Sequence, residues 1–151
     1  MSLITTKGAY GLMAVFEVSK GTSEHPVSIN AISANIGVSR NYLEQILNAL
    51  KKAGIISAVK GMKGGYYLSK GLSEISFGEV LDTLENDFGF FAKDIEGEYK
   101  ELFGTLDKEL KKLFSKPLSE FNKNADIDQK SQSKLTANLP KTKAKITAQK
   151  V

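Results

Sequence analysis

The chain has 151 residues, 41% of them hydrophobic, which suits one compact domain with an appendage rather than two independent domains. No stretch approaches the roughly 20 consecutive apolar residues of a membrane span, and the N-terminus lacks a charged-then-apolar signal peptide, so we expect a cytoplasmic protein. The absence of cysteine excludes disulfides, thiolate metal sites and cysteine nucleophiles, and the single histidine, His25, lies in a polar loop without a second ligand nearby.

The net charge of +4 is distributed unevenly along the chain. Residues 1–71 contain 8 Lys or Arg against 3 Asp or Glu, a net charge of +5. Residues 72–114 contain 5 against 11, a net charge of −6, and residues 115–151 contain 8 against 3, again +5. A basic first segment suits a polyanionic partner, whereas the acidic middle segment must face elsewhere.

The first predicted helix covers Lys7 to Ser19, where apolar side chains form a broad face. Thr5 or Thr6 could cap its start. A polar loop with glycine and proline, residues 21–26, follows it.

Two shorter helices are predicted next. Ser28 is a suitable N-cap for the first of them, which carries three isoleucines and stops at Gly37. Ser39 caps the second, whose apolar residues recur at helical spacing until Gly54. Because only two residues separate them, the pair has the signature of a helix-turn-helix.

A glycine-rich hairpin is predicted directly after this pair. Residues 55–59 and 66–68 have the pattern of strands, and residues 60–65 form a tip with two lysines and three glycines. A helix-turn-helix followed by a hairpin with a basic tip indicates a winged helix. We therefore predict a mainly α protein with a small two-stranded wing.

The rest of the chain is predicted to be helical and then polar. Ser76 and Glu79 form a capping box at the start of a helix that continues through Leu84. Residues 86–97 are acidic and less regular. Pro117 bends or ends the next helix, and the Lys-rich segment from about residue 122 has a composition typical of disorder. The predicted division is a DNA-binding domain at 1–71, a helical linker and dimerisation region at 72–121, and a tail at 122–151.

The helix that Pro117 bends or ends carries a long apolar stripe. A minimal winged helix has little surface with which to cover it, so we expect a second copy of the chain to bury it, as a homodimer. The predicted interface consists of Tyr99, Leu102, Phe103, Leu106, Leu110, Leu113 and Phe114.

The second helix of the pair has the chemistry of a recognition helix. It is expected to expose Arg40, Asn41 and Glu44, side-chain types that pair with guanine, adenine and cytosine edges in the major groove. The wing presents Lys60 and Lys63 on a backbone whose glycines allow close approach to a phosphate or to the minor groove. The alternatives are an ordinary solvated helix face and a plain hairpin with incidental lysines.

No enzyme chemistry is indicated. The acidic residues of the middle segment fit no calcium loop, and no nucleophile has a base at a recognisable spacing. We therefore expect neither catalytic residues, nor a metal, nor a cofactor.

Residues 3–85 resemble the Rrf2 family of bacterial winged helix-turn-helix regulators. The resemblance rests on four segments in order: Ile4-Thr-Thr-Lys-Gly-Ala-Tyr10, Ser39-Arg-Asn-Tyr-Leu-Glu-Gln-Ile46, Leu50-Lys-Lys-Ala-Gly-Ile55 and Val59-Lys-Gly-Met-Lys-Gly-Gly-Tyr66. The last two, in that order and spacing, are highly specific. By position and pattern, the helix of residues 97–116 also looks like the family's dimerisation helix.

The resemblance implies contacts with double-stranded operator DNA. It implies base or backbone contacts from Ser39, Asn41 and Glu44, and a minor-groove contact from Lys60, where an arginine is common in the family. The candidate DNA contacts come from the helix starts, the recognition helix, the wing and the shared segments; they are Lys7, Tyr10, Ser28, Ser39, Arg40, Asn41, Tyr42, Glu44, Gln45, Lys60, Lys63, Gly64 and Tyr66.

The chain departs from part of the family in one respect. Several members carry three cysteines before the long helix and use them to hold an iron–sulfur cluster. The equivalent stretch here, residues 86–97, has none, so sensing through a thiolate-held cluster is excluded. The cysteine-free members resemble this chain better, and in that group a partner protein or a small molecule supplies the signal.

Three functional hypotheses follow. The first is a sequence-specific homodimeric regulator, expected to be a repressor. The second is a winged helix kept as a protein-interaction module, for which the acidic 72–114 segment would offer a surface to a basic partner. The third is a non-specific nucleic-acid binder driven by the Lys-rich tail.

Overall fold

Three helices and a hairpin form the first half of the molecule. The computed structural model describes residues 2–85, 88–91 and 95–122, and Met1–Phe121 form one compact unit. Its first elements are α1 (Thr6–Val18), α2 (Ile29–Ile36), α3 (Arg40–Lys52), β1 (Ile56–Val59) and β2 (Gly65–Leu68).

Each of the three helices begins at a predicted cap. The side-chain oxygens of Thr5, Ser28 and Ser39 accept hydrogen bonds from the backbone N–H three residues further on, at 3.2–3.3 Å. These bonds satisfy N–H groups that the first helical turn leaves without partners. The predicted helices are confirmed, and Thr5 is the residue that caps α1.

The turn between α2 and α3 depends on a left-handed glycine. Gly37 has a φ of 73°, and its N–H donates to the Ser33 carbonyl at 3.0 Å. Non-glycine residues adopt this backbone conformation only at a cost, so the glycine ends α2 here. The Ser33 hydroxyl also donates to the Val38 carbonyl at 2.6 Å, which further fixes the approach to α3.

β1 and β2 pair as an antiparallel hairpin, with Ile56 opposite Leu68 and Val59 opposite Gly65. The hairpin confirms the predicted wing, although β1 begins one residue later and β2 one residue earlier than expected. On the outer edge of β2, the backbone groups of Tyr66 and Val27 exchange two hydrogen bonds of 2.8 Å. The wing is therefore tied to the segment that leads into α2.

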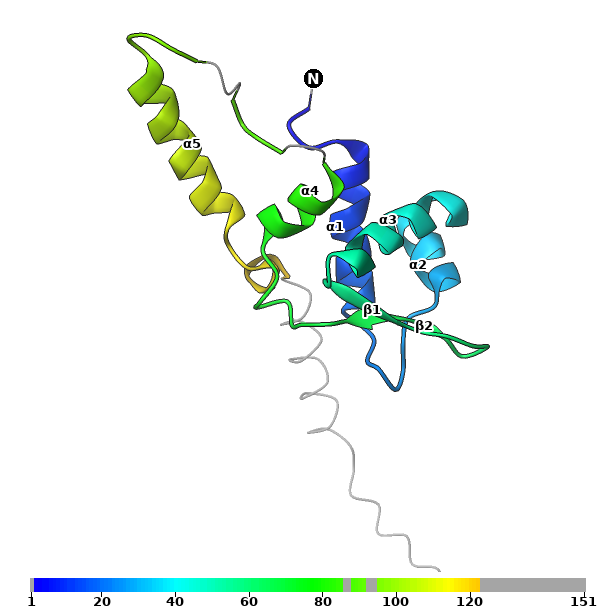
Figure 1. Cartoon of the computed structure of the whole chain (residues 1–151). Helices are drawn as coiled ribbons and strands as arrows, with labels where there is room; N and C mark the ends of the chain where they lie inside the picture. Colours follow the sequence, from blue (N-terminus) through cyan, green and yellow to red (C-terminus); the bar gives the residue numbers. More distant parts are fainter. Residues whose placement is uncertain (1, 86–87, 92–94, 123–151) are drawn as a thin grey trace, which may run out of the picture. The chain divides into compact units, whose positions relative to one another are not determined.

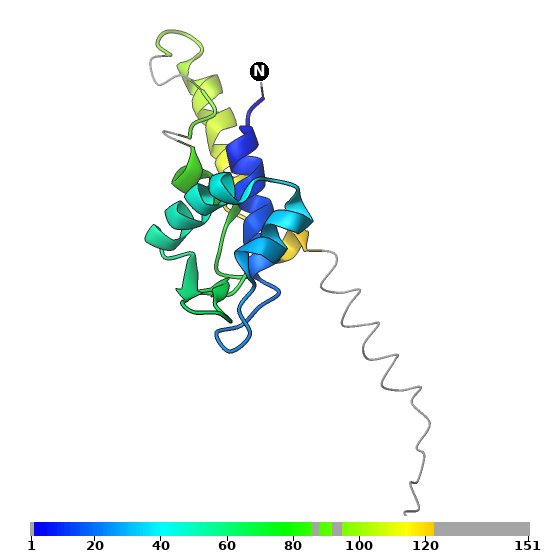
Figure 2. The ribbon, with the colours of Figure 1, turned by 90° about the vertical axis from the view of Figure 1, so that its right-hand side faces the viewer.

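α1 occupies the middle of the unit, with α2, α3 and α4 (Phe77–Leu84) packed around it (Figures 1 and 2). The core is made of aliphatic side chains, of which the largest contribution comes from α3, because four of its apolar residues repeat at intervals of three and four. The fully buried α3 side chains are Leu43, Ile46, Leu47 and Leu50.

α4 packs closely on α1 because two α1 glycines, Gly8 and Gly11, present no side chain there. A Cβ at Gly11 would collide with Leu84 of α4, and one at Gly8 would lie 3.0 Å from Leu81. The start of α4 forms only half of the expected capping box. Ser76 accepts from the Glu79 N–H at 3.1 Å, but the Glu79 carboxylate binds Lys70.

The chain returns to the core after α5 (Lys100–Phe114). A short 3-10 helix, η1 (Leu118–Phe121), places Leu118 in full burial, and the Leu118 N–H donates to the Ile75 carbonyl at 2.8 Å. The core therefore includes residues beyond 71, while the predicted division at that point stays a prediction. The predicted tail lies, apart from Asn122, outside the described residues.

Candidate nucleic-acid interface

α3 has two sharply different faces. Its apolar residues are buried, whereas Arg40, Asn41, Glu44 and Gln45 are exposed along the first two turns, together with the cap residue Ser39. The division agrees with the expected orientation of a recognition helix. The start of the helix therefore exposes a guanidinium, two side-chain amides and a carboxylate, which are groups that can read base edges.

Two tyrosines flank this face. Tyr42 lies on the edge of α3, and its ring meets that of Tyr10 edge to face, with centroids 6.1 Å apart. Tyr66 comes from the wing. Burial raises the pKa of its phenol, the charge of Glu44 raises it further, and the charge of Arg40 opposes the shift. The phenol of Tyr66 on β2 therefore lies within reach of the charges of the first turns of α3.

The wing tip is a tight turn with two exposed lysines. The Gly64 N–H donates to the Gly61 carbonyl at 3.0 Å, and Gly61 has a φ of 112°. A Cβ at Gly64 would collide with the Val59 carbonyl oxygen, so only glycine fits this position with the present backbone. Lys60 and Lys63 are exposed on this tip.

The start of α2 belongs to the same region. Ser28 follows directly on Val27, whose backbone pairs with the wing. The Ser28 hydroxyl oxygen caps α2, and its O–H is left for another acceptor. A helix start with exposed N–H groups and a hydroxyl is suited to a phosphate oxygen.

Lys7 is exposed in the first turn of α1, whose start is held by Glu85. The Glu85 carboxylate accepts from the Thr5 N–H at 3.0 Å and from the Thr5 hydroxyl at 2.6 Å. Sequence reasoning missed Glu85, because nothing in the residues around it indicates a contact 80 positions away. The end of α4 thus helps to position a candidate DNA-contacting residue.

The predicted dimer stripe on α5 is divided between two environments. Phe103 and Phe114 pack within the chain: Phe103 contacts Phe91 at 5.3 Å between ring centroids, and Phe114 contacts Phe90 at 4.9 Å. The expectation that the whole stripe lacks an intrachain partner is therefore wrong for these two residues. Four others are 43–61% exposed along one edge of the helix: Tyr99, Leu102, Leu106 and Leu113. Leu110 is half-buried.

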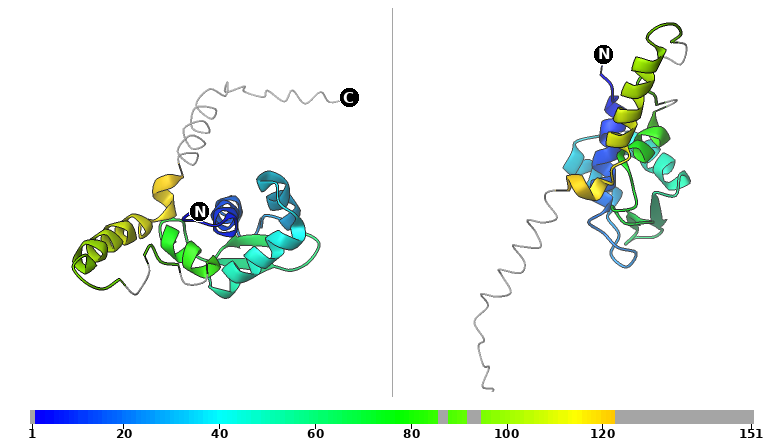
Figure 3. Two further views of the ribbon diagram at one scale, coloured as in Figure 1. Left: turned by 90° about the horizontal axis from the view of Figure 1, so that it is seen from above. Right: turned by 90° about the vertical axis from the view of Figure 1, so that its left-hand side faces the viewer.

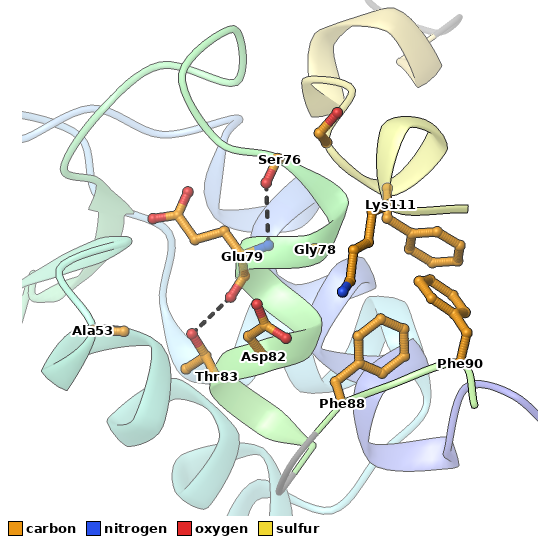
Figure 4. A pocket seen from close by; sticks show the side chains of 11 residues that line it. Ala53, Ser76, Gly78, Glu79, Asp82, Thr83, Phe88, Phe90 and Lys111 are labelled. Atoms are coloured by element: carbon orange, nitrogen blue, oxygen red, sulfur yellow. Dashed lines mark hydrogen bonds between the residues drawn. The ribbon is translucent and has the colours of Figure 1, made fainter. Parts of the chain in front are cut away.

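A cavity of about 640 Å³ lies between α4, the aromatic segment 88–91 and the end of α5 (Figure 4). Phe88, Phe90 and Phe114 line one side, and the lining also includes Asp82 and Lys111, whose amino group pairs with Asp107 at 2.6 Å. Sequence reasoning did not single out this cavity, although the run Phe-Gly-Phe-Phe at 88–91 was a visible signal. The cavity is open to solvent on one side, and its lining combines phenylalanine rings with the charged side chains of Glu79, Asp82 and Lys111.

Two further features concern the described part of the chain only. Its His, Asp and Glu residues form no group of three or more arranged to hold a metal ion. None of its helices combines the length and apolarity that crossing a bilayer demands.

Comparisons with known proteins agree with this geometry. The family model for Rrf2, described as an iron-dependent transcriptional regulator, matches residues 4–126. The HTH-type transcriptional regulator IscR of Escherichia coli is 39% identical over 82 residues, which are 54% of this chain and 51% of IscR. The chain thus spans about half the length of the curated relatives it matches.

Two solved structures extend the similarity. CymR of B. subtilis, named as the global cysteine regulator, is 31% identical with a TM-score of 0.70 over 80% of this chain and 96% of CymR. IscR of T. potens is also 31% identical, with a TM-score of 0.67 over 83% of this chain and 90% of that protein. Both alignments extend beyond the winged helix.

Proposed function

The chain belongs to the Rrf2 family, and from this membership we propose that it is a cytoplasmic transcription regulator that binds operator DNA as a homodimer and acts as a repressor. The observation that carries the proposal is the joint exposure of the α3 start and the cationic wing tip on neighbouring parts of the molecule. The family's members are transcriptional regulators, and the chain is not an enzyme.

In this proposal, α3 enters the major groove and the wing lies over the adjacent backbone. Asn41 and Glu44 read base edges, because both are exposed in the first turns of the helix. Lys60 and Lys63 contact phosphate or the minor groove. Lysine is a point charge without the planar fork of arginine, so Lys60 discriminates groove width less sharply than an arginine would.

The exposed edge of α5 supports the homodimer. Leu102, Leu106 and Leu113 follow one another at intervals of four and seven residues and stay in solvent. Figure 3 shows α5 on the side of the unit away from the hairpin tip, so a partner on this edge leaves the candidate DNA face free. Burying such a stripe against its own copy is the simplest closed arrangement.

The regulator works without a thiolate-held cluster, because these 151 residues contain no cysteine. The signal then comes from an effector protein or a small molecule. We assign a small effector to the cavity beside Phe88 and Phe90. Its lining comes from both α4 and the end of α5, and α4 in turn packs on α1, so a molecule bound there would contact both regions.

We expect Glu44→Ala and Lys63→Ala to change DNA binding in different ways. Loss of Glu44 removes a base-reading group, so discrimination should fall by about 1–3 kcal/mol at one or two operator positions. Loss of Lys63 removes a phosphate contact, so all duplexes should bind more weakly and the salt slope should fall by about one. The measurement is binding to single-base variants of a selected duplex at several salt concentrations.

Lys108→Ala is the matched control, because it removes one exposed lysine from α5 and should leave both quantities unchanged. If Glu44→Ala keeps the wild-type preference at every position, α3 does not read the major groove. Equal affinity of the wild type for unrelated duplexes would favour the non-specific binder. Unchanged affinity after replacement of Arg40, Glu44 and Lys60 would favour the protein-interaction module.

A further inference from the structure

The wing tip carries one large apolar side chain, Met62, at its most exposed point. Its relative exposure is 106%, higher than that of any other large hydrophobic residue in the described part of the chain. A fully exposed methionine gains nothing from burial in the free protein. Its side chain can contribute only when another molecule covers it.

The backbone holds Met62 in a defined position. Met62 and Lys63 are the two central residues of the turn closed by the hydrogen bond from the Gly64 N–H to the Gly61 carbonyl. The collision that a Cβ at Gly64 would make with Val59 shows how closely the two strands approach there. Met62 therefore projects from a constrained hairpin end rather than from a long loop.

The charges around Met62 indicate what covers it. Lys60 and Lys63, both exposed, lie two residues before and one residue after it. Two cations that flank an apolar side chain match the minor groove, where phosphate rows border a floor of base edges and sugar carbons. Methionine is flexible and polarisable, and its sulfur is a weak acceptor, so it fits an apolar groove better than one lined by donors.

We propose that Met62 is a specificity-determining residue whose thioether side chain enters the minor groove beneath the wing and disfavours guanine there. The guanine 2-amino group projects into that groove, and covering it with an apolar side chain leaves a donor without a partner. A·T pairs lack this group. This inference rests on the proposed function, and it adds a base preference that neither lysine supplies.

The test uses inosine. Inosine–cytosine and guanine–cytosine pairs are alike in the major groove and differ in the minor groove by the 2-amino group. In a duplex selected from a random pool with the wild-type protein, each pair near the wing is replaced, one at a time, by G·C and in a parallel duplex by I·C. Affinities are measured for the wild type, Met62→Ala, Met62→Leu and Lys63→Ala, with unfolding curves as a check on folding.

At one or two of the substituted positions, we expect the wild type and Met62→Leu to bind the duplex with I·C about tenfold more tightly than the duplex with G·C. Met62→Ala should lose most of this ratio while keeping the wild-type salt slope, because it removes no charge. Lys63→Ala should keep the ratio and lower the slope by about one. Comparing ratios between variants cancels the effect of inosine on the duplex itself.

A Met62→Ala variant that keeps the full I·C to G·C ratio would overturn the proposal, and so would a wild type that shows no ratio at any pair. A selection that returns no shared sequence would instead overturn the proposed sequence-specific function. In that case a random-sequence duplex with every guanine replaced by inosine is compared with the unmodified duplex for the wild type and Met62→Ala, which still decides the role of Met62, so the two failures are distinguishable.

Discussion

Replacing Leu102 and Leu106 together with glutamate is expected to convert the protein into a monomer and to weaken operator binding by about a hundredfold or more. Both leucines lie on the exposed edge of α5, at 53% and 43% exposure. In a dimer this edge is buried, and two glutamates on each copy would place four unpaired carboxylates in the contact. The measurements are sedimentation velocity and operator affinity.

The loss of affinity follows from geometry rather than from any direct DNA contact. A dimer holds two recognition helices at a fixed spacing, so the second half-site binds at a high effective concentration. A monomer binds each half-site independently. Half-site affinity should therefore remain close to that of the wild type, and only binding to the complete operator should fall.

The matched control is Thr105→Glu with Lys108→Glu, which places two carboxylates on exposed positions of the same helix away from the apolar edge. This variant should remain a dimer. If the leucine variant sediments like the wild type, the dimer contact lies on another surface. Because no α5 side chain is fully buried, both variants should keep the fold of the unit.

Gly11→Ala is expected to destabilise the protein by about 1–3 kcal/mol, although alanine is the better helix former. Gly11 is buried where α1 meets α4, and a Cβ there would collide with Leu84 and lie 3.8 Å from Ile46. Leu84 is only 4% exposed and has little room to move. Either the two helices move apart or Leu84 leaves its rotamer, and both cost packing energy.

Gly104→Ala is the control for this substitution. Gly104 lies inside α5, and a Cβ there meets no atom within 4 Å. It should therefore show the helix-propensity gain alone, a stabilisation of about 0.5–1 kcal/mol. Urea unfolding of the two variants should shift in opposite directions. A stabilised Gly11→Ala protein would contradict the close approach of α1 and α4.

The sequence by itself determined the features that depend on neighbouring residues. Ser28 and Ser39 could be identified as caps, and the first cap could be narrowed to Thr5 or Thr6, because a cap bonds to an N–H two or three positions away. Gly37 marked the turn because a helix often ends with a residue in the left-handed backbone conformation, which glycine adopts most easily. The amphipathic period of α3 likewise predicted which of its side chains face solvent. Most of the candidate DNA face follows from these local rules.

Only the tertiary structure decided the contacts between segments far apart in the chain. Glu85 holds Thr5 across 80 positions, and Leu118 fills the core after the chain has passed through α5. The division of the α5 stripe was equally invisible, because periodicity shows that Phe114 is on an apolar face and not that other phenylalanines cover it. Such pairings depend on which surfaces fit together in space, and the composition and spacing of residues within one helix do not show which surfaces those are.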